Sequence, residues 1–169
     1  MSLYDHTIPQ FMKMLRNLDT WLDKGAAHAA AKKFEPNLLM SLRLAPDMYP
    51  LVKQIQSACD TAKFTAAYMT DTQPPVHPDT EVTLEEGRAR IRTCLGYLEG
   101  FQPSQFAGAE GRRIAPKWLG GKWIRGDQYV IEAALPNFYF HITTAYDILR
   151  HNGVDVGKFD FMGSLPAQD

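Results

Sequence analysis

The sequence predicts an all-α protein, a four-helix bundle with a short β-hairpin inserted before the last long helix. Four segments repeat apolar residues at helical spacing, and the last of them is apolar on almost every side. The helical period then fails between residues 102 and 125. A length of 169 residues with 45% hydrophobic content suits one core, so residues 1–169 are assigned to a single domain with a peripheral tail at 158–169.

The first two helices are bounded by glycine and proline. Apolar residues three and four positions apart predict a first helix from Thr7 to Lys24, which Gly25 ends. A second helix is predicted from Asp47 to Met69, and Pro46 and Pro50 fix its start.

The third helix begins with a capping box. The Thr83 side chain accepts from the first turn, and Glu86 reaches back to the Thr83 backbone. The helix extends to about Leu98, and the spacing of Glu86 and Arg90 predicts an ion pair across one turn.

A β-hairpin is predicted at Lys117–Ile124, with Gly120 and Gly121 as its two-residue turn. This register places Trp118 opposite Trp123. A lone hairpin is marginal in water, so we expect it to lie against the bundle or to cover one end of it.

The last helix is predicted from Gly126 to Gly153, with Asp127 as N-cap and Asn152 in its stop signal. Pro136 cannot donate to the Glu132 carbonyl, so we expect a kink there.

A polar face follows the expected kink. Asn137, His141 and Thr144 are spaced by four and then three residues, which places them on one side of the helix. A neutral imidazole in this setting can act as a general base or can orient a ligand by hydrogen bonding. We therefore take His141 as the candidate catalytic residue, and Asn137 and Thr144 as further ligand-binding residues.

On the second helix, Asp60 and Lys63 lie roughly opposite the apolar stripe. One interpretation is a solvated face. The other is a covered face, because Phe64 and Tyr68 share that side of the helix.

Composition argues against several classes of protein. A net charge of −1 without a long basic run lacks the signature of a nucleic-acid binder. No apolar run reaches 18 residues, so a membrane span is not expected. The first residues lack a signal-peptide pattern, which predicts a cytoplasmic protein with Cys59 and Cys94 reduced in the core.

Three segments carry a resemblance to a known family, namely HTIPQF, RLAPDMYPLVKQIQSACDTAK and LPNFYFHITTAYDILRHNGVDVGKFDF. They resemble a bacterial family of unknown function placed beside the DinB/YfiT-type four-helix bundles. The resemblance covers nearly the whole chain and implies the DinB-like fold. The wider group is similar to metal-dependent thiol transferases and hydrolases, which hold a divalent metal with three histidines.

The resemblance also implies positions for the metal ligands. One histidine of the wider group lies in the second helix and two lie four residues apart in the last helix. Matching these patterns places the ligands at Gln54, Asn137 and His141. An amide oxygen is a poorer ligand for zinc or nickel than imidazole, so this set is incomplete.

Three functional hypotheses remain open at this point. The first is a protein that binds a small molecule around His141 without a tightly held metal. The second is a transferase or hydrolase of the DinB-like type that uses a divalent metal or His141 as base. The third is a structural or regulatory homodimer, whose aromatic tail forms the interface.

Overall fold

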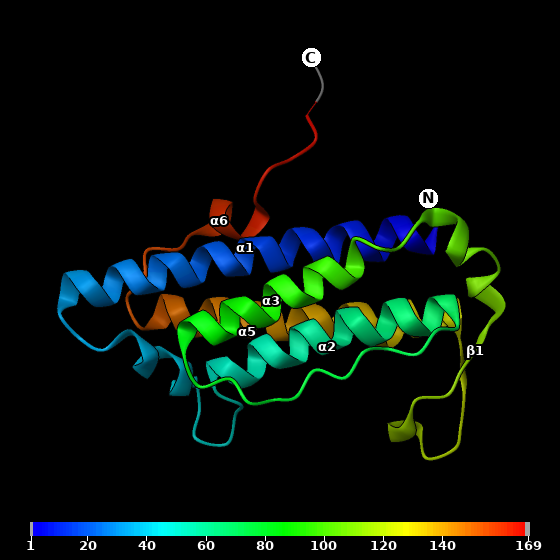
Figure 1. The fold of residues 1–169 in the computed structure, drawn as a ribbon, viewed down its shortest axis with the longest axis horizontal. Coiled ribbons are helices and arrows are strands. Elements are labelled where there is room, and N and C mark those ends of the chain that lie inside the picture. The colour runs from blue at the N-terminus through cyan, green and yellow to red at the C-terminus, as the bar shows by residue number, and fades with distance from the viewer. Residues whose placement is uncertain (1, 168–169) are drawn as a thin grey trace.

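Four long helices pack side by side in the computed structural model, which describes residues 2–167 (Figure 1). This arrangement, with one two-stranded hairpin before the last helix, confirms the predicted fold class. The long elements are α1 (Leu3–Lys32), α2 (Leu51–Thr70), α3 (Leu84–Leu98) and a last helix made of α4 (Gly126–Tyr129), the π-helical η5 (Val130–Ala134) and α5 (Leu135–His151).

Short elements connect the long helices. Four are 3-10 helices, two are strands and one is a terminal helix. They are η1 (Pro36–Ser41), η2 (Pro103–Phe106), η3 (Ala109–Gly111), β1 (Arg113–Ile114), η4 (Lys117–Leu119), β2 (Ile124–Arg125) and α6 (Lys158–Met162). The connector between α2 and α3 returns along the length of the bundle beside both helices (Figure 1).

Helix α1 is longer than the predicted Thr7–Lys24. It begins after Ser2, whose side chain forms a capping box with Asp5, and it continues through Gly25 to Lys32. The helix does not end at Gly25. The missing side chain of this glycine instead allows Leu39 to pack closely against α1. A Cβ added there would lie 3.2 Å from Leu39 Cδ1.

The last helix contains a π-helical turn where a kink was predicted. Pro136 lacks an N–H, and the Leu135 N–H bonds to the carbonyl of Val130, five residues earlier. Arg125 occupies the N-cap position in place of the predicted Asp127. The stop at Asn152 and Gly153 is confirmed, with Gly153 at φ 88°.

The hairpin differs from its predicted register. Its strands pair Arg113 with Arg125 and Ile114 with Ile124, so the predicted Trp118–Trp123 strand pair is wrong. Gly120 and Gly121 do form the tip, where the Lys122 N–H donates to the Leu119 carbonyl at 3.1 Å. The pairing does not continue from this turn because residues 117–119 form a 3-10 turn. Trp123 packs under the Arg113 guanidinium at 4.6 Å.

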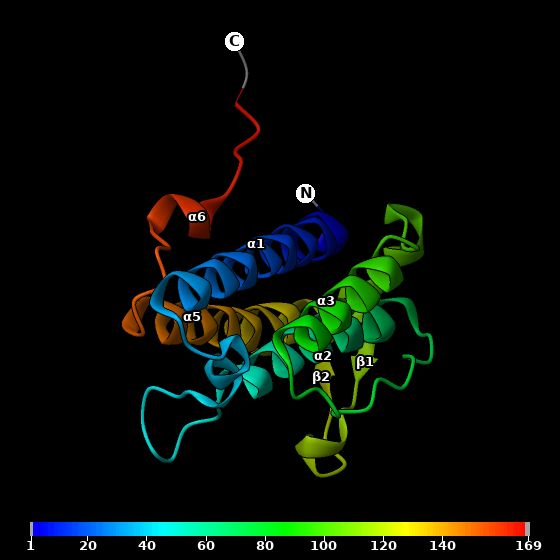
Figure 2. The same cartoon turned by 60° about the vertical axis from the view of Figure 1, so that its left-hand side comes forward.

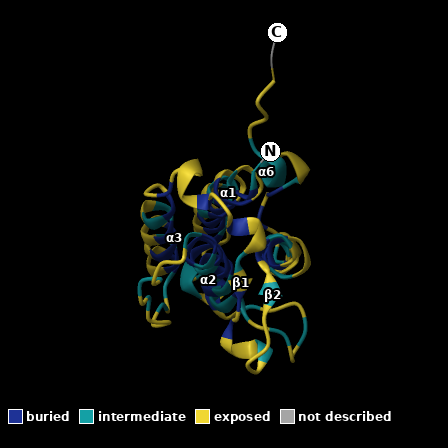
Figure 3. Ribbon diagram, turned by 90° about the vertical axis from the view of Figure 1, so that its right-hand side faces the viewer, coloured by how far each residue is buried: buried dark blue, intermediate teal, exposed yellow. Residues whose placement is uncertain are grey.

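The core lies between the helices, where buried residues face inward and exposed residues face out (Figure 3). Phe11 of α1 and Phe138 of α5 meet with ring centroids 4.4 Å apart. Cys59 of α2 and Cys94 of α3 are both buried, and both are free thiols. No helix within residues 2–167 is long and apolar enough to cross a membrane.

The C-terminal segment lies on the outer side of α1 (Figures 1 and 2). Phe161 of α6 stacks on the buried Trp21 with ring centroids 5.6 Å apart, and Lys24 pairs with Asp160 at 2.6 Å. Phe159 is exposed. Residues 168 and 169 of the predicted peripheral tail lie outside the described residues.

Candidate functional site

A cavity of about 980 Å³ opens between α2, the last helix and the loop that joins β1 to β2. Its polar lining comes from two helices, with Ser57, Asp60 and Thr61 on α2 and Glu132, Asn137 and His141 on the last helix. Five aromatic rings complete much of the wall. They belong to Phe64, Tyr68, Trp118, Tyr129 and Phe140.

The two helices run antiparallel along this cavity, which gives it a polar end and an aromatic end. At the polar end Gln54 contacts His141. Thr61, two turns further along α2, contacts Asn137, which lies one turn before His141 on α5. At the aromatic end Tyr68 packs edge-on against Tyr129 with ring centroids 5.6 Å apart. The π-helical turn η5 lies beside this second end, and such turns are frequent at functional sites.

The orientation of His141 is set by Gln54. The Gln54 amide nitrogen donates to the Tyr49 carbonyl at 2.9 Å, which leaves its Oε1 facing His141 Nδ1 at 2.8 Å. Because Oε1 can only accept, Nδ1 carries the ring proton. Nε2 of His141 therefore holds a free lone pair, and no atom of residues 2–167 is hydrogen-bonded to it.

Burial keeps the imidazole of His141 neutral. His141 is 8% exposed, and this burial lowers the pKa of its imidazole below the usual value. A neutral imidazole with a free Nε2 accepts hydrogen bonds and can take a proton from a bound molecule. Apart from Lys117, His141 is the only residue of the described cavity lining that presents a basic nitrogen.

Asn137 is also held in place by α2. Its amide nitrogen donates to the Thr61 hydroxyl at 2.7 Å, and that hydroxyl donates to the Ser57 carbonyl at 2.7 Å. Asn137 Oδ1 accepts from no group within residues 2–167. Thr144 is buried, but it is not among the residues that line the cavity. Asn137 and His141 thus both line the cavity, Gln54 contacts His141 without lining it, and Thr144 does neither.

A charge cluster of Asp60, Lys63 and Arg90 lies beside the cavity. Asp60 Oδ1 accepts from Arg90 at 2.8 Å and from Lys63 at 2.7 Å. The side chains of Arg90 and Lys63 are 2% and 3% exposed, so this face of α2 is covered. The predicted solvated face is therefore wrong, and the alternative of a covered face is confirmed.

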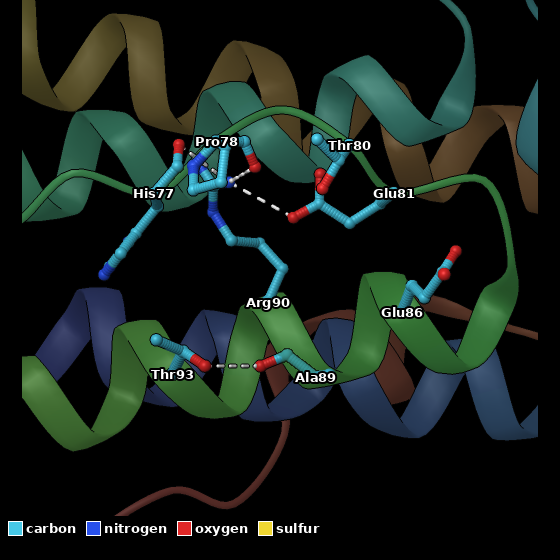
Figure 4. Close-up of a pocket in the computed structure, with 8 residues that line it drawn as sticks. All are labelled: His77, Pro78, Thr80, Glu81, Glu86, Ala89, Arg90 and Thr93. Atoms are coloured by element: carbon cyan, nitrogen blue, oxygen red, sulfur yellow. Dashed lines mark hydrogen bonds and ion pairs between the residues drawn. The ribbon is translucent and has the colours of Figure 1, made fainter.

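The connector between α2 and α3 passes over the Arg90 side chain of the charge cluster (Figure 4). Arg90 donates to the carbonyls of His77 and Pro78 at 3.3 and 3.1 Å, and it pairs with Glu81 at 3.2 Å. The predicted Glu86–Arg90 ion pair is wrong, because Glu86 caps its own helix and Arg90 points toward the connector. A second cavity of about 280 Å³ lies here.

Two charged side chains, Lys117 and Glu132, lie near the aromatic end of the large cavity. Burial raises the pKa of Tyr129 to about 12, and burial also raises the pKa of Tyr68. Both phenols therefore stay protonated at neutral pH. Phe64 and Tyr68, one turn apart on α2, stack with an interplanar angle of 20°.

The three residues that the resemblance places at metal positions are not arranged to bind one metal ion together. Gln54 lies on the Nδ1 side of the imidazole, whereas a cation would bind at Nε2. No group of three His, Cys, Asp or Glu side chains within residues 2–167 is arranged to hold a metal. An imidazole and an amide oxygen make a weak set for zinc or nickel. The metal assignment stays a prediction.

Several lining residues were not identified from the sequence. Ser57 and Thr61 are one turn apart on α2, and this spacing was a usable signal because it continues the side of Phe64. Glu132 and Trp118 gave no such signal. Their place in the lining depends on the π-helical turn and on the path of the loop after β1.

Comparison with known proteins agrees with the resemblance noted in the sequence. Residues 3–162 match the family described as a domain of unknown function, DUF1993. A crystal structure of a DinB family member protein from Shewanella denitrificans is similar, with a TM-score of 0.95 and 48% sequence identity. The similarity covers 99% of this chain and 95% of that one. No curated protein matches the chain.

Proposed function

The chain belongs to the DUF1993 family and is a DinB-type bundle, and from this premise we propose that it binds a small organic molecule in the cavity between α2 and α5. The observation that carries the proposal is the free Nε2 of His141 in the wall of a cavity of about 980 Å³. Cavities of this size, with apolar walls and a few oriented polar groups, are typical of ligand sites.

The polar groups are oriented before any ligand binds. Gln54 fixes the ring of His141, and Thr61 fixes the amide of Asn137. Such preorganisation lowers the entropy that a ligand must lose on binding. His141 and Asn137 are therefore the residues we expect to contact the ligand, with Gln54 holding His141 in position.

A second candidate function is a transferase or hydrolase reaction at the same site. The neutral imidazole favours it, because Nε2 can remove a proton from a bound hydroxyl or thiol. In this version His141 acts as general base and Gln54 stabilises the imidazolium that forms. A divalent metal at Nε2 is the alternative within this candidate, with Asn137 as a further oxygen ligand.

Binding is tested by recording protein NMR spectra while a diverse set of small organic fragments is added to the full chain. We expect fragments to shift the resonances of Thr61, Asn137 and His141. His141→Ala should weaken their binding by roughly tenfold, the value of one good hydrogen bond. His151→Ala, at the exposed end of the same helix, is the matched control and should bind as the parent does.

One result would contradict the binding proposal, and a second measurement distinguishes the two candidate functions. Spectra in which no fragment shifts a residue of the cavity lining would rule out the binding function. Metal analysis of the purified protein separates the two candidates. Near-stoichiometric zinc, nickel or iron that is lost in His141→Ala would favour the metal-dependent enzyme over a metal-free binding protein.

We further propose that the protein acts as a homodimer in the cytoplasm. The support is that the last helix leaves two large apolar side chains, Ile131 and Phe140, exposed. Phe161, by contrast, packs within its own chain on Trp21. A sedimentation mass that stays at 19.1 kDa as concentration rises would contradict the dimer.

A further inference from the structure

The polar end of the cavity presents hydrogen-bond acceptors. Nε2 of His141 has a lone pair and no proton, because the ring proton is on Nδ1. Asn137 directs its amide nitrogen to Thr61, so its Oδ1 is the atom left for a ligand. The Thr61 hydroxyl already donates its proton to the Ser57 carbonyl. A ligand group placed here must supply the protons.

Asp60 adds a carboxylate oxygen to this set. Arg90 and Lys63 both contact Oδ1, while Oδ2 has no partner within residues 2–167. The two cations are sealed from solvent behind Asp60, whose own side chain is 29% exposed and lines the cavity. They hold the carboxylate by Oδ1, which leaves Oδ2 as the oxygen available to a ligand in the cavity that Asp60 lines.

The charged side chains of the cavity lining favour a cation, because two of them, Asp60 and Glu132, are carboxylates and one, Lys117, is a lysine. Glu132 lies in η5 beside the aromatic end, is exposed and has no ion-pair partner in the described part of the chain. Lys117, the one lysine or arginine among the lining residues, lies on the hairpin loop next to Trp118. Lys63 and Arg90 contact Asp60 Oδ1 and offset its charge, so the exposed carboxylate of Glu132 is what disfavours an anionic ligand.

The aromatic end lies a short distance away along the same helix. Asp60 and Phe64 are four residues apart on α2, which corresponds to about 6 Å along the helix axis. Phe64 and Tyr68 are stacked, and the edge of Tyr129 faces Tyr68. Lys63 Nζ lies over the Phe64 ring, 4.7 Å from its centroid, and both the Phe64 and Tyr68 rings line the cavity, where they suit a flat ring.

We propose that the cavity binds a primary arylalkylamine as its ammonium ion. The ammonium group donates to Asp60 Oδ2, Asn137 Oδ1 and His141 Nε2, and the aryl ring packs against Phe64 and Tyr68. Three protons meet three acceptors in this arrangement. The inference rests on the proposed small-molecule binding and names the class of molecule.

The test compares three molecules of the same size that differ in their head group. They are 2-phenylethylammonium, 2-phenylethanol and phenylacetate, titrated into the full chain by calorimetry with NMR to locate the site. We expect the amine to bind roughly tenfold more tightly than the alcohol, because hydrogen bonds to charged groups are about twice as strong. Phenylacetate should bind most weakly.

A variant isolates the exposed carboxylate of the cavity lining without disturbing the charge cluster. Glu132→Gln keeps the shape of the side chain, and it should weaken the amine by roughly threefold, as expected for an exposed charge, while leaving the alcohol unchanged. Glu110→Gln, an exposed carboxylate away from the cavity lining, is the control and should change neither ligand.

The outcomes separate this inference from the binding function itself. If the alcohol or the acid binds as tightly as the amine, or if none of the three binds while other fragments occupy the cavity, the amine assignment is overturned and the binding function stands. If no fragment of any class shifts the resonances of the lining residues, the binding function fails and the inference fails with it.

Discussion

A glutamine amide determines how the candidate site histidine works. Gln54 is anchored by the Tyr49 carbonyl, so it presents an oxygen and not an N–H to His141. The consequence is a defined tautomer with its lone pair on Nε2. Gln54 and His141 are 87 residues apart in the chain, and their contact depends on the antiparallel packing of α2 and α5.

Burial of His141 predicts a pH dependence of stability. Because burial lowers the pKa of the folded state, the unfolded chain binds the proton at a higher pH. The free energy of unfolding should therefore fall as pH falls through about 6.5, the value for an unfolded histidine. His77 acts in the same direction, since burial, Lys63 and Arg90 also lower its pKa.

Urea unfolding at pH 7.5, 6.5 and 5.5 measures this effect. His141→Gln keeps an amide that can donate to Gln54, so the protein should fold while losing part of the pH dependence. His77→Gln should remove a separate part, and the double variant should show the flattest profile. A His141→Gln protein that loses stability as steeply as the parent would show that His141 does not contribute.

At the scale of elements, the sequence was sufficient for the helices and insufficient for their ends. The four periodic segments predicted the helices of the bundle, and the Thr83–Glu86 capping box predicted the start of the third, because both signals are local. Gly25 was misleading, since a glycine ends a helix in one context and permits close packing in another. Only the position of Leu39, fixed by the tertiary fold, distinguishes the two.

The candidate site shows the same division. His141 and Asn137 were predictable because they share a face of one helix, and Gln54 came from the family resemblance. The sequence left open whether the face of Asp60 is covered, because the connector that covers this face carries no periodic signal. Trp118 reaches the cavity from a hairpin whose strands pair further from the Gly120–Gly121 turn than the sequence predicted.

Gly126 joins the hairpin to the last helix and predicts a sharp difference between two glycines. A Cβ at Gly126 would lie 1.9 Å from the backbone oxygen of Ala109, whereas a Cβ at Gly96 of α3 meets nothing within 4 Å. Gly126→Ala should destabilise the protein by about 3 kcal/mol or more, because the backbone must move. Gly96→Ala should stabilise it by about 0.5–1 kcal/mol through helix propensity.

Thermal melting monitored by circular dichroism checks the pair. The melting temperature should fall for Gly126→Ala and rise for Gly96→Ala. Equal shifts in the same direction would mean that the Gly126–Ala109 contact is not rigid. NMR of Gly126→Ala should also show the largest changes around η3 and the start of the last helix, where the added methyl group acts.

At the scale of the whole molecule, Arg90 links parts that are distant in sequence. Its guanidinium on α3 contacts Asp60 on α2 and the carbonyls of His77 and Pro78 on the connector. Asp60 in turn lines the large cavity. The same side chain therefore holds the connector against the bundle and orients a carboxylate of the candidate site.

This position makes Arg90→Ala a test of how stability and site are connected. Removing the guanidinium leaves Asp60 and Glu81 without their shared partner, so the free energy of unfolding should fall by about 3 kcal/mol in urea titrations. Arg92→Ala on the same helix removes a side chain that is 49% exposed and pairs with Glu85, and it should cost less than about 1 kcal/mol.

Arg90→Met separates the loss of charge from the loss of volume. If the charge holds the connector, both Arg90 variants should speed hydrogen exchange of the connector amides between residues 72 and 82, and Arg92→Ala should not. Binding at the cavity should weaken in parallel, because Asp60 loses one of the two cations that orient it. Equal stability of the Arg90 and Arg92 variants would show that the buried cluster does not hold these parts together.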